Sequence, residues 1–392
     1  MKKRNMFYSF VTFGLIMIAM GVSDALRGVF IPVFAARYHL SGIAQSGIVG
    51  VSYLGSLFFL LLGGRLTDRY SKKKVAIALL VIWMASLVLY ELTDSYAAIV
   101  FGMFFSMGTS MMLCTLVNLL TPLQFGSAPG MVINLLFFVQ GIGTTFTQKV
   151  IGGMATDISA WKTAILVLLV VGLGMQALLI GYKLPEGAAP APVEKKQSVS
   201  LRQIFGVREF WFLLLAVGMY MIADHGLMNW LITYCISGLG FSAADGGTCL
   251  ALFYGTITVG RLVFSPLIQK MGLLRGLLLF AAGAALFYVI SFLHPSKTIW
   301  LLTAAGVFTS VMYPTLTMLV QNYYAPDIRA TASGAIIGAA TVLEIIFNFS
   351  FGSIVDTVGY DTTMWILPVA MVFCLTGVLL LRLLGTERYK VA

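Results

Sequence analysis

Long apolar runs separated by short polar segments fill the chain from end to end. Residues 75–92 and 277–293 show the pattern clearly, because together they hold a single charged residue, Glu91. A helix of about 20 apolar residues crosses the hydrocarbon core of a bilayer, whereas a β-barrel would alternate apolar and polar residues. Twelve membrane-spanning helices are predicted, near residues 6–34, 43–64, 75–93, 96–120, 130–151, 161–182, 209–236, 243–265, 273–293, 298–321, 331–353 and 362–384.

Composition narrows the class of protein. Of the 392 residues, 59% are hydrophobic and 10% are charged, and the mean hydropathy is +0.94. A soluble domain carries about 25% charged residues, so a soluble enzyme, a disulfide-rich secreted domain and a disordered protein are excluded. The chain is expected to be an all-α polytopic membrane protein. Its four cysteines stand singly in apolar runs and are expected to fill helix packing.

Basic residues set the expected orientation. With the N-terminus in the cytoplasm, the segments on that side hold 19 Lys and Arg residues, against four on the other side. This asymmetry follows the positive-inside rule, and it predicts a multi-pass protein of the cytoplasmic membrane with both termini cytoplasmic. The first apolar run is longer than the core of a signal peptide, so it is interpreted as a retained span.

The chain is predicted to divide into two halves. Residues 183–208 are rich in Pro, Ala and charge, and they form the expected cytoplasmic linker between residues 1–182 and 209–392. The halves also match each other at a constant offset of 204 positions. The matching pairs include Gly102 and Gly306, Asn118 and Asn322, Pro122 and Pro326, and Gln140 and Glu344. Two pseudo-symmetric six-helix bundles related as parallel repeats are the plan of a large group of transporters.

The loop after the second span carries a specific motif. Residues 64–74 read Gly-Arg-Leu-Thr-Asp-Arg-Tyr-Ser-Lys-Lys-Lys. This resembles the signature loop of the major facilitator superfamily, G-x-L-x-D-R-x-G-R/K-K, with Ser71 in place of the second glycine. The twelve spans and the central linker extend the resemblance to the whole chain. It implies the major facilitator fold, and a conformational-switch role for the loop and its counterpart in the second half: Gly64, Arg65, Asp68, Arg69, Lys72, Gly260 and Arg261.

Span 7 suggests a branch of that family. Its spacing is similar to the pattern of fucose-permease-like sugar–proton symporters, on Tyr220, Asp224, Gly226, Trp230 and Tyr234. The resemblance implies sugar transport coupled to protons. Two departures leave the coupling open, because the fucose permease pattern has carboxylates where this chain has Gly28 in span 1 and Cys114 in span 4.

Charged side chains inside predicted spans are candidate functional groups, because a charge at membrane depth is costly unless it faces a cavity or a partner. They are Asp24, Arg27, Asp224, His225 and Glu344. Asp24 and Arg27 lie at i and i+3, so they can form a structural ion pair, a gate or a substrate contact. Asp224 and Glu344 fall near the middle of their spans and are the candidate proton carriers, with interhelical hydrogen bonding as the alternative. His225 lies about 100° round the helix from Asp224, so no dyad is expected, and a packed neutral His is the alternative.

Amide and aromatic side chains complete the candidate site. Amides offer donors and acceptors suited to hydroxyl groups, and Trp and Tyr rings can stack on a sugar ring. Gln140 is the counterpart of Glu344, so the halves place polar residues at corresponding points, as a midplane site would need. The set is Asn118, Asn134, Gln140, Asn229, Trp230, Tyr313, Gln321 and Asn348, with packing or interhelical hydrogen bonding as the alternative role of each.

Other chemistries find little support in the sequence. Two glycine-rich stretches, at 172–177 and 238–243, match a dinucleotide fingerprint but lie outside any predicted strand–turn–helix unit. No GxxxxGK[ST] motif occurs, so ATP is not expected to drive transport. We expect no enzymatic activity, no metal, no nucleic-acid partner, and no cofactor other than a proton gradient.

These patterns predict a secondary active transporter that works by alternating access. The expected cargo is a small polar solute, a sugar or polyol, moved with protons by a monomer in the lipid bilayer. A carrier of small organic anions is the alternative, because Arg27 and Arg261 could hold a carboxylate bidentately. A drug exporter would need a more apolar cavity, and a non-transporting receptor would gain nothing from buried acids.

Overall fold

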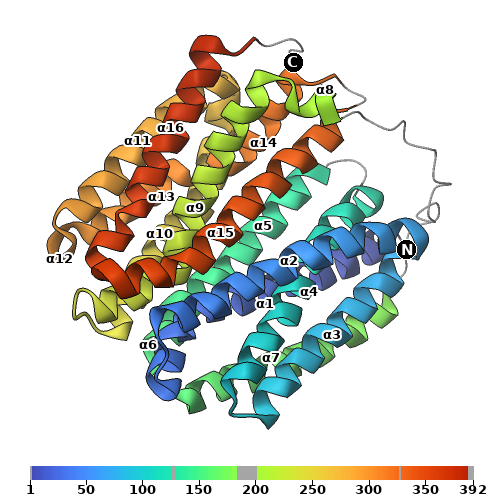
Figure 1. The fold of residues 1–392 in the computed structure, drawn as a ribbon. Helices are drawn as coiled ribbons and strands as arrows, with labels where there is room; N and C mark the ends of the chain where they lie inside the picture. Colours follow the sequence, from blue (N-terminus) through green and yellow to red (C-terminus); the bar gives the residue numbers. More distant parts are fainter. Residues whose placement is uncertain (1, 126–128, 183–200, 326–327, 387–392) are drawn as a thin grey trace. The chain divides into compact units, whose positions relative to one another are not determined.

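A computed structural model describes residues 2–125, 129–182, 201–325 and 328–386 of the chain (Figure 1). Every regular element in these ranges is a helix, and twelve helical stretches are long and apolar enough to cross a membrane. The prediction of an all-α protein with twelve spans is therefore confirmed.

Helix contacts divide the chain into two units, Met1–Lys195 and Lys196–Ala392, and this division falls within residues 183–208. The first unit contains α1 (Lys2–Tyr38), α2 (Gly42–Arg69), α3 (Lys72–Leu92), α4 (Tyr96–Gln124), α5 (Pro129–Phe146), η1 (Thr147–Ile151), α6 (Gly152–Met154) and α7 (Ile158–Gly181). The second contains α8 (Leu201–Phe205), α9 (Arg208–Ser237), α10 (Ala243–Met271), α11 (Leu273–Leu293), α12 (Pro295–Thr298), η2 (Ile299–Leu301), α13 (Leu302–Thr309), α14 (Met312–Tyr323), α15 (Arg329–Met364) and α16 (Ile366–Leu384).

Short polar loops set where several helices begin. Ser41 and Ser242 cap α2 and α10 by accepting hydrogen bonds from backbone amides of the first turn. Asp157 caps α7 in the same way, accepting from the amides of Ser159 and Ala160 at 2.9 and 3.0 Å. Hydrogen bonds from the Ser159 hydroxyl and from these amides lower the pKa of the Asp157 carboxyl, because they favour its charged form. The capping side chains accept hydrogen bonds from backbone amides of the first turn, which have no acceptor within the helix.

Three spans depart from a single regular α-helix. In span 5, α5 continues into the π-helical turn η1, and span 10 is divided among α12, η2, α13 and α14. In span 11, α15 runs beyond the predicted end at residue 353 and bends at Gly359, which has φ 79° and ψ 169°. A glycine adopts this conformation without the steric cost that a Cβ atom would impose.

Glycine contacts bring the second and fourth spans of each unit close together. A Cβ atom at Gly55 of α2 would collide with the carbonyl oxygen of Phe104 in α4. In the second unit, a Cβ atom at Gly306 of α13 would collide with the carbonyl oxygen of Phe253 in α10. Small residues allow such backbone contact between helices in membranes, where packing takes over from the hydrophobic effect.

Basic side chains donate hydrogen bonds to the last carbonyls of the final helix in each unit. Lys73 of α3 donates from Nζ to the carbonyls of Ile180 and Tyr182 at the end of α7, both at 2.6 Å. Arg208 of α9 donates to the carbonyl of Leu384 at the end of α16. The last carbonyls of a helix lack intrahelical donors, and a cation there also interacts favourably with the helix dipole. Both units therefore fasten the end of their last helix with a cation from another helix.

Replacing Gly55 with alanine should destabilise the first unit, because the new methyl group meets rigid backbone. Overpacking of this kind costs about 1–3 kcal/mol, so the melting temperature of the purified protein should fall by roughly 4 °C. Gly174 of α7 has no atom within 4 Å of its would-be Cβ, so Gly174→Ala is the matched control and should leave the melting temperature unchanged or slightly raised. Equal melting temperatures for both variants would contradict the close contact.

Candidate functional site

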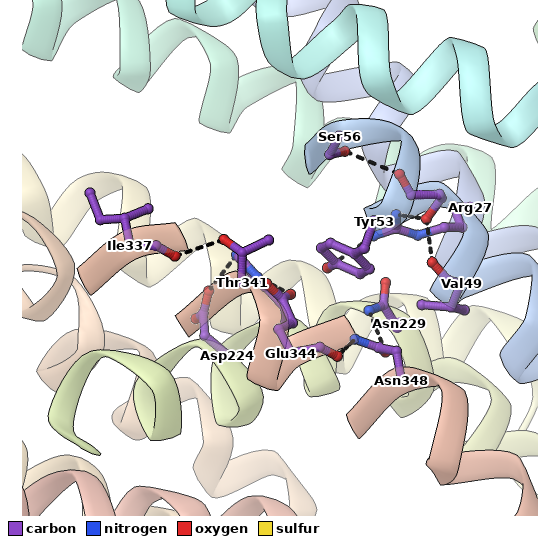
Figure 2. A network of polar contacts seen from close by, with 12 residues as sticks. Arg27, Val49, Tyr53, Ser56, Asp224, Asn229, Ile337, Thr341, Glu344 and Asn348 are labelled. Atoms are coloured by element: carbon purple, nitrogen blue, oxygen red, sulfur yellow. Dashed lines mark hydrogen bonds and ion pairs between the residues drawn. The ribbon is translucent and has the colours of Figure 1, made fainter. Parts of the chain in front are cut away.

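A histidine lies between two acids in the second unit. His225 Nδ1 is 2.5 Å from Glu344 Oε1, and His225 Nε2 is 4.0 Å from Asp224 Oδ2 (Figure 2). The expectation that Asp224 and His225 would not pair is therefore wrong. The angle between adjacent residues on a helix describes where their Cβ atoms point, whereas the imidazole carries a nitrogen on each of two edges and reaches an acid on either side. The three residues form the acid–histidine cluster of α9 and α15.

The members of this cluster differ in exposure. The side chain of Glu344 is 1% exposed and that of Asp224 is 9% exposed, whereas that of His225 is 32% exposed. Glu344 Oε2 and Asp224 Oδ1 are buried without a hydrogen-bond partner among the described residues. A buried carboxylate oxygen without a donor is costly, and a bound proton relieves that cost by neutralising the charge. The arrangement can therefore take up and release protons, with His225 as its most accessible member.

Asn348 fastens α9 to α15 one turn beyond Glu344. Its Oδ1 accepts hydrogen bonds from Asn229 Nδ2 at 3.2 Å and from Trp230 Nε1 at 3.3 Å, while its Nδ2 donates to the Glu344 carbonyl at 2.9 Å. The Trp230 ring stacks on Phe351 with 4.4 Å between the ring centroids. Asn229, Trp230 and Asn348 are each at most 1% exposed. In this structure they make internal contacts that hold the two acid-bearing helices in register, and Figure 2 shows Asn229 beside Asn348.

Tyrosines from three helices contact α9 within about one turn of Asp224, and the sequence did not single out Tyr254, which contacts Asp224 itself. Tyr254 of α10 donates from its hydroxyl to the Asp224 carbonyl at 3.0 Å and lies 3.4 Å from Oδ2 of the same residue. Tyr288 of α11 donates to the Ala223 carbonyl at 3.4 Å. Tyr313 of α14 stacks on Tyr220 with 6.2 Å between the ring centroids. Gln321 also lies in α14, but its side chain is outside the described part of the chain.

Asp24 and Arg27 of the first unit contact different helices. Asp24 accepts a hydrogen bond from Ser110 of α4 at 2.7 Å. Arg27, which is 4% exposed, donates to Ser52 of α2 at 2.5 Å and to Tyr53 at 3.2 Å. Its guanidinium also lies 4.6 Å from the centroid of the Tyr53 ring (Figure 2). Neutral hydroxyls and an aromatic face thus support this buried cation. The predicted ion pair between Asp24 and Arg27 stays a prediction.

The amides predicted for the first unit lie in different surroundings. Gln140 Nε2 donates to the Cys114 sulfur at 3.6 Å, at the position where the fucose permease pattern has a carboxylate. Asn118 is half-buried, and its Oδ1 has no hydrogen-bond partner among the residues described. Asn134 is exposed. Gln140 and Asn118 therefore present polar groups on helices α5 and α4, which both pack in the same unit as Asp24.

The signature loop is mostly exposed, and its counterpart is packed. Arg65 and Arg69 are exposed and Lys72 is half-buried, whereas the Asp68 side chain lies outside the described part of the chain. At the counterpart, a Cβ atom at Gly260 would lie 2.6 Å from the Ser310 hydroxyl, and Arg261 donates from Nε to the Ser310 carbonyl at 3.3 Å. Gly64 is exposed. Gly260 and Arg261 thus contact the break between α13 and α14.

Over the described ranges, no group of three or more His, Cys, Asp or Glu residues could hold a metal ion.

Comparison with known proteins agrees with this architecture. A family model described as Major Facilitator Superfamily matches residues 12–347. A solved D-xylose-proton symporter is 15% identical over 97% of this chain and 98% of its own, with a TM-score of 0.77. A solved structure of the E. coli Fucose:proton symporter, FucP, is 19% identical over 94% and 97%, with a TM-score of 0.64. The nucleoside transporter NupG is 13% identical over 98% and 100%, with a TM-score of 0.70.

A curated relative covers less of the chain. Protein TsgA of Escherichia coli O17:K52:H18 is 33% identical over 130 residues, which is 33% of this chain and 31% of TsgA. The match spans about a third of the length of such relatives. At identities below 25%, the solved structures show a shared fold.

Replacing Asn348 with alanine should loosen the contact between α9 and α15. The change removes the acceptor of two hydrogen bonds, from Asn229 and Trp230, and the unpaired buried indole N–H costs about 1–3 kcal/mol. The melting temperature should fall by roughly 4 °C or more. Asn134 is exposed, so Asn134→Ala is the matched control and should be neutral. An unchanged melting temperature for Asn348→Ala would mean that these contacts do not hold the helices together.

Proposed function

The chain belongs to the Major Facilitator Superfamily, and we propose that it carries a small polar solute, a sugar or polyol, across the cytoplasmic membrane together with protons. It is a multi-pass membrane transporter and not an enzyme. The proposed orientation has both termini in the cytoplasm, from the distribution of basic residues. The proposed working form is a monomer that needs no cofactor beyond the proton gradient.

The acid–histidine cluster is the observation that carries this proposal. Two carboxyl groups and one imidazole lie within the spans, and two of the four carboxyl oxygens have no donor among the described residues. Ionisable groups at membrane depth are expensive to keep and mark proton or substrate paths. A purely structural role would be served as well by neutral amides. Proton binding is therefore the function that best accounts for both acids.

The geometry supports a sequence of proton steps within the cluster. His225 is the most exposed member, so the proposed path begins with a proton on the imidazole. Glu344 Oε1 lies beside Nδ1 and Asp224 Oδ2 lies nearest to Nε2, so the ring can pass a proton to either acid. Neutralising Glu344 of α15 weakens its attraction to His225 of α9 and lowers the cost of moving the two helices against each other. Solute transport would use this change in helix packing.

Polar groups of the first unit support a hydroxylated solute. Asp24, Gln140 and Asn118 lie on α1, α5 and α4 and offer carboxylate and amide groups. Such groups hydrogen-bond to hydroxyls both as donors and as acceptors. Two solved structures of the same fold are proton symporters of xylose and fucose by description, and this adds support for a sugar or polyol.

A small organic anion is the second candidate for the solute. Arg261 is half-buried on α10, and its Nε donates to the Ser310 carbonyl. The two terminal guanidinium nitrogens could hold a carboxylate in a bidentate geometry. Arg27 is the candidate cation of the first unit, and a carboxylate there would have to displace Ser52 and Tyr53 from its terminal nitrogens.

The proposal is tested by proton movement into liposomes that contain the purified protein and an internal pH dye. The liposomes are challenged with L-fucose, D-xylose, D-mannitol, lactate and oxalate in turn. Acidification of the interior by a sugar or polyol supports the proposed function, and acidification by the carboxylates alone favours the anion carrier. No proton movement with any of these compounds, in liposomes where solute uptake itself is measurable, would contradict proton coupling.

Glu344→Gln and Asp224→Asn should abolish proton-driven accumulation of the solute. Each change removes a carboxyl group while keeping its shape, and accumulation should fall at least roughly tenfold, whereas exchange of solute across the membrane without a gradient should persist. Asp94 forms an exposed ion pair with Lys162, so Asp94→Asn is the control and should behave as the wild type. Full pH-dependent uptake in the Glu344→Gln and Asp224→Asn double variant would remove the cluster from the mechanism.

Arg261→Lys and Arg27→Lys separate the two candidate solutes. Lysine keeps the charge but loses the planar fork, so a bidentate carboxylate site should lose roughly tenfold or more in apparent affinity, whereas a sugar site should change by less than about twofold. The affinity is measured as the concentration of solute that gives half-maximal uptake by each variant.

A further inference from the structure

Two tyrosine hydroxyls meet consecutive carbonyls in the middle of α9. Tyr254 of α10 donates to the carbonyl of Asp224, and Tyr288 of α11 donates to the carbonyl of Ala223. Both tyrosines are buried, with exposures of 8% and 0%. A carbonyl oxygen has two lone pairs, so each of these carbonyls can accept the tyrosine and an amide of its own helix. The two hydroxyls thereby fix α9 against its neighbours at the height of Asp224.

Only one of these two tyrosines also reaches a carboxyl group. The Tyr254 hydroxyl lies 3.0 Å from the Asp224 carbonyl oxygen and 3.4 Å from Asp224 Oδ2. A hydroxyl has a single hydrogen to donate, so the carbonyl and the carboxylate compete for it. An ionised carboxylate is the stronger acceptor, whereas a protonated carboxyl competes poorly. The partner of the Tyr254 hydrogen therefore depends on whether Asp224 carries a proton.

We propose that Tyr254 is a positioning residue that converts the protonation of Asp224 into a change in how α10 holds α9. With Asp224 ionised, Tyr254 donates to Oδ2 and weakens its bond to the α9 backbone. With Asp224 protonated, Tyr254 donates to the backbone carbonyl, which is a weaker contact because neither partner is charged. The role in transport rests on the proposed proton coupling, but the link between Tyr254 and Asp224 does not.

Several ionisable groups share these surroundings. His225 is 4.0 Å from Asp224 Oδ2, and Glu344 lies on the far side of the imidazole. The groups are Tyr220 and His225 of α9, Tyr254 and Arg261 of α10, Tyr288 of α11, Tyr313 of α14, Glu344 of α15 and Cys374 of α16. Within this set, Tyr254 is the group whose hydroxyl contacts both the side chain and the backbone of Asp224.

The experiment compares Tyr254→Phe with Tyr288→Phe, which removes a hydroxyl that donates to the α9 backbone. The full chain is purified in detergent, and melting temperatures are measured at about pH 5 and about pH 8 without any solute. Tyr254→Phe should lower the melting temperature by about 3 °C or more at the higher pH, where an ionised Asp224 loses its donor, and by less than about half as much at the lower pH. Tyr288→Phe should lower it equally at both pH values.

A second comparison tests whether the pH dependence of the Tyr254→Phe effect comes from the Asp224 carboxyl group. In an Asp224→Asn background the acceptor no longer titrates, so Tyr254→Phe should have the same effect at both pH values. A Tyr254→Phe effect that is equal at both pH values in the otherwise wild-type chain would overturn the proposal. So would a pH-dependent effect that survives in Asp224→Asn, or a Tyr254→Phe chain that fails to fold at both pH values while Tyr288→Phe folds.

Transport measurements then separate a failure of the Tyr254 proposal from a failure of the proposed function. In the liposome assay, Tyr254→Phe should shift or flatten the pH profile of proton-driven uptake and leave the half-maximal solute concentration within about twofold of wild type. Wild-type liposomes that take up solute without protons contradict the proposed function. Proton-coupled wild-type liposomes whose pH profile coincides with that of Tyr254→Phe contradict the role of Tyr254 alone.

Discussion

In a bilayer, a charged side chain persists only where another polar group compensates it, and in the second unit His225 does this for two acids at once. Its two nitrogens lie 2.5 Å from Glu344 and 4.0 Å from Asp224. The acids belong to α9 and α15, so their shared imidazole requires these helices to stay in register. The contacts of Asn348 with Asn229 and Trp230 maintain that register one turn away. The polar network of this unit is therefore organised around a single bridging ring.

The two units use related contacts with opposite charges. In the first unit, Tyr53 of α2 accepts a hydrogen bond from Arg27 of α1. In the second, Tyr254 of α10 donates one to Asp224 of α9. A tyrosine hydroxyl can act as donor or acceptor, so it supports a cation in one repeat and an acid in the other.

The spans were predictable because each helix must be long enough and apolar enough to cross the hydrocarbon core of the bilayer. The acids were also visible in the sequence, since a charge stands out in an apolar run. The pairing of His225 with Asp224 was not predictable, because helical angles do not describe how far an imidazole reaches. Tyr254 was missed because a tyrosine in an apolar span resembles packing. Side-chain contacts between helices decide both cases, and sequence periodicity does not contain them.

Cys114 supports the proposal that the second unit binds protons and the first unit binds the solute. The fucose permease pattern has a carboxylate at this position, whereas here the thiol accepts a hydrogen bond from Gln140. A thiol releases its proton far less readily than a carboxyl group, so span 4 lacks the proton-exchanging group of that pattern, and the proposal assigns proton exchange to Asp224 and Glu344 and solute contact to Asp24. Protons and solute would then be bound by different units, and the coupling would have to pass through helix packing. The Tyr254 hydroxyl contacts both the carboxyl group and the backbone of Asp224, so it is the proposed first step of this transmission within the second unit.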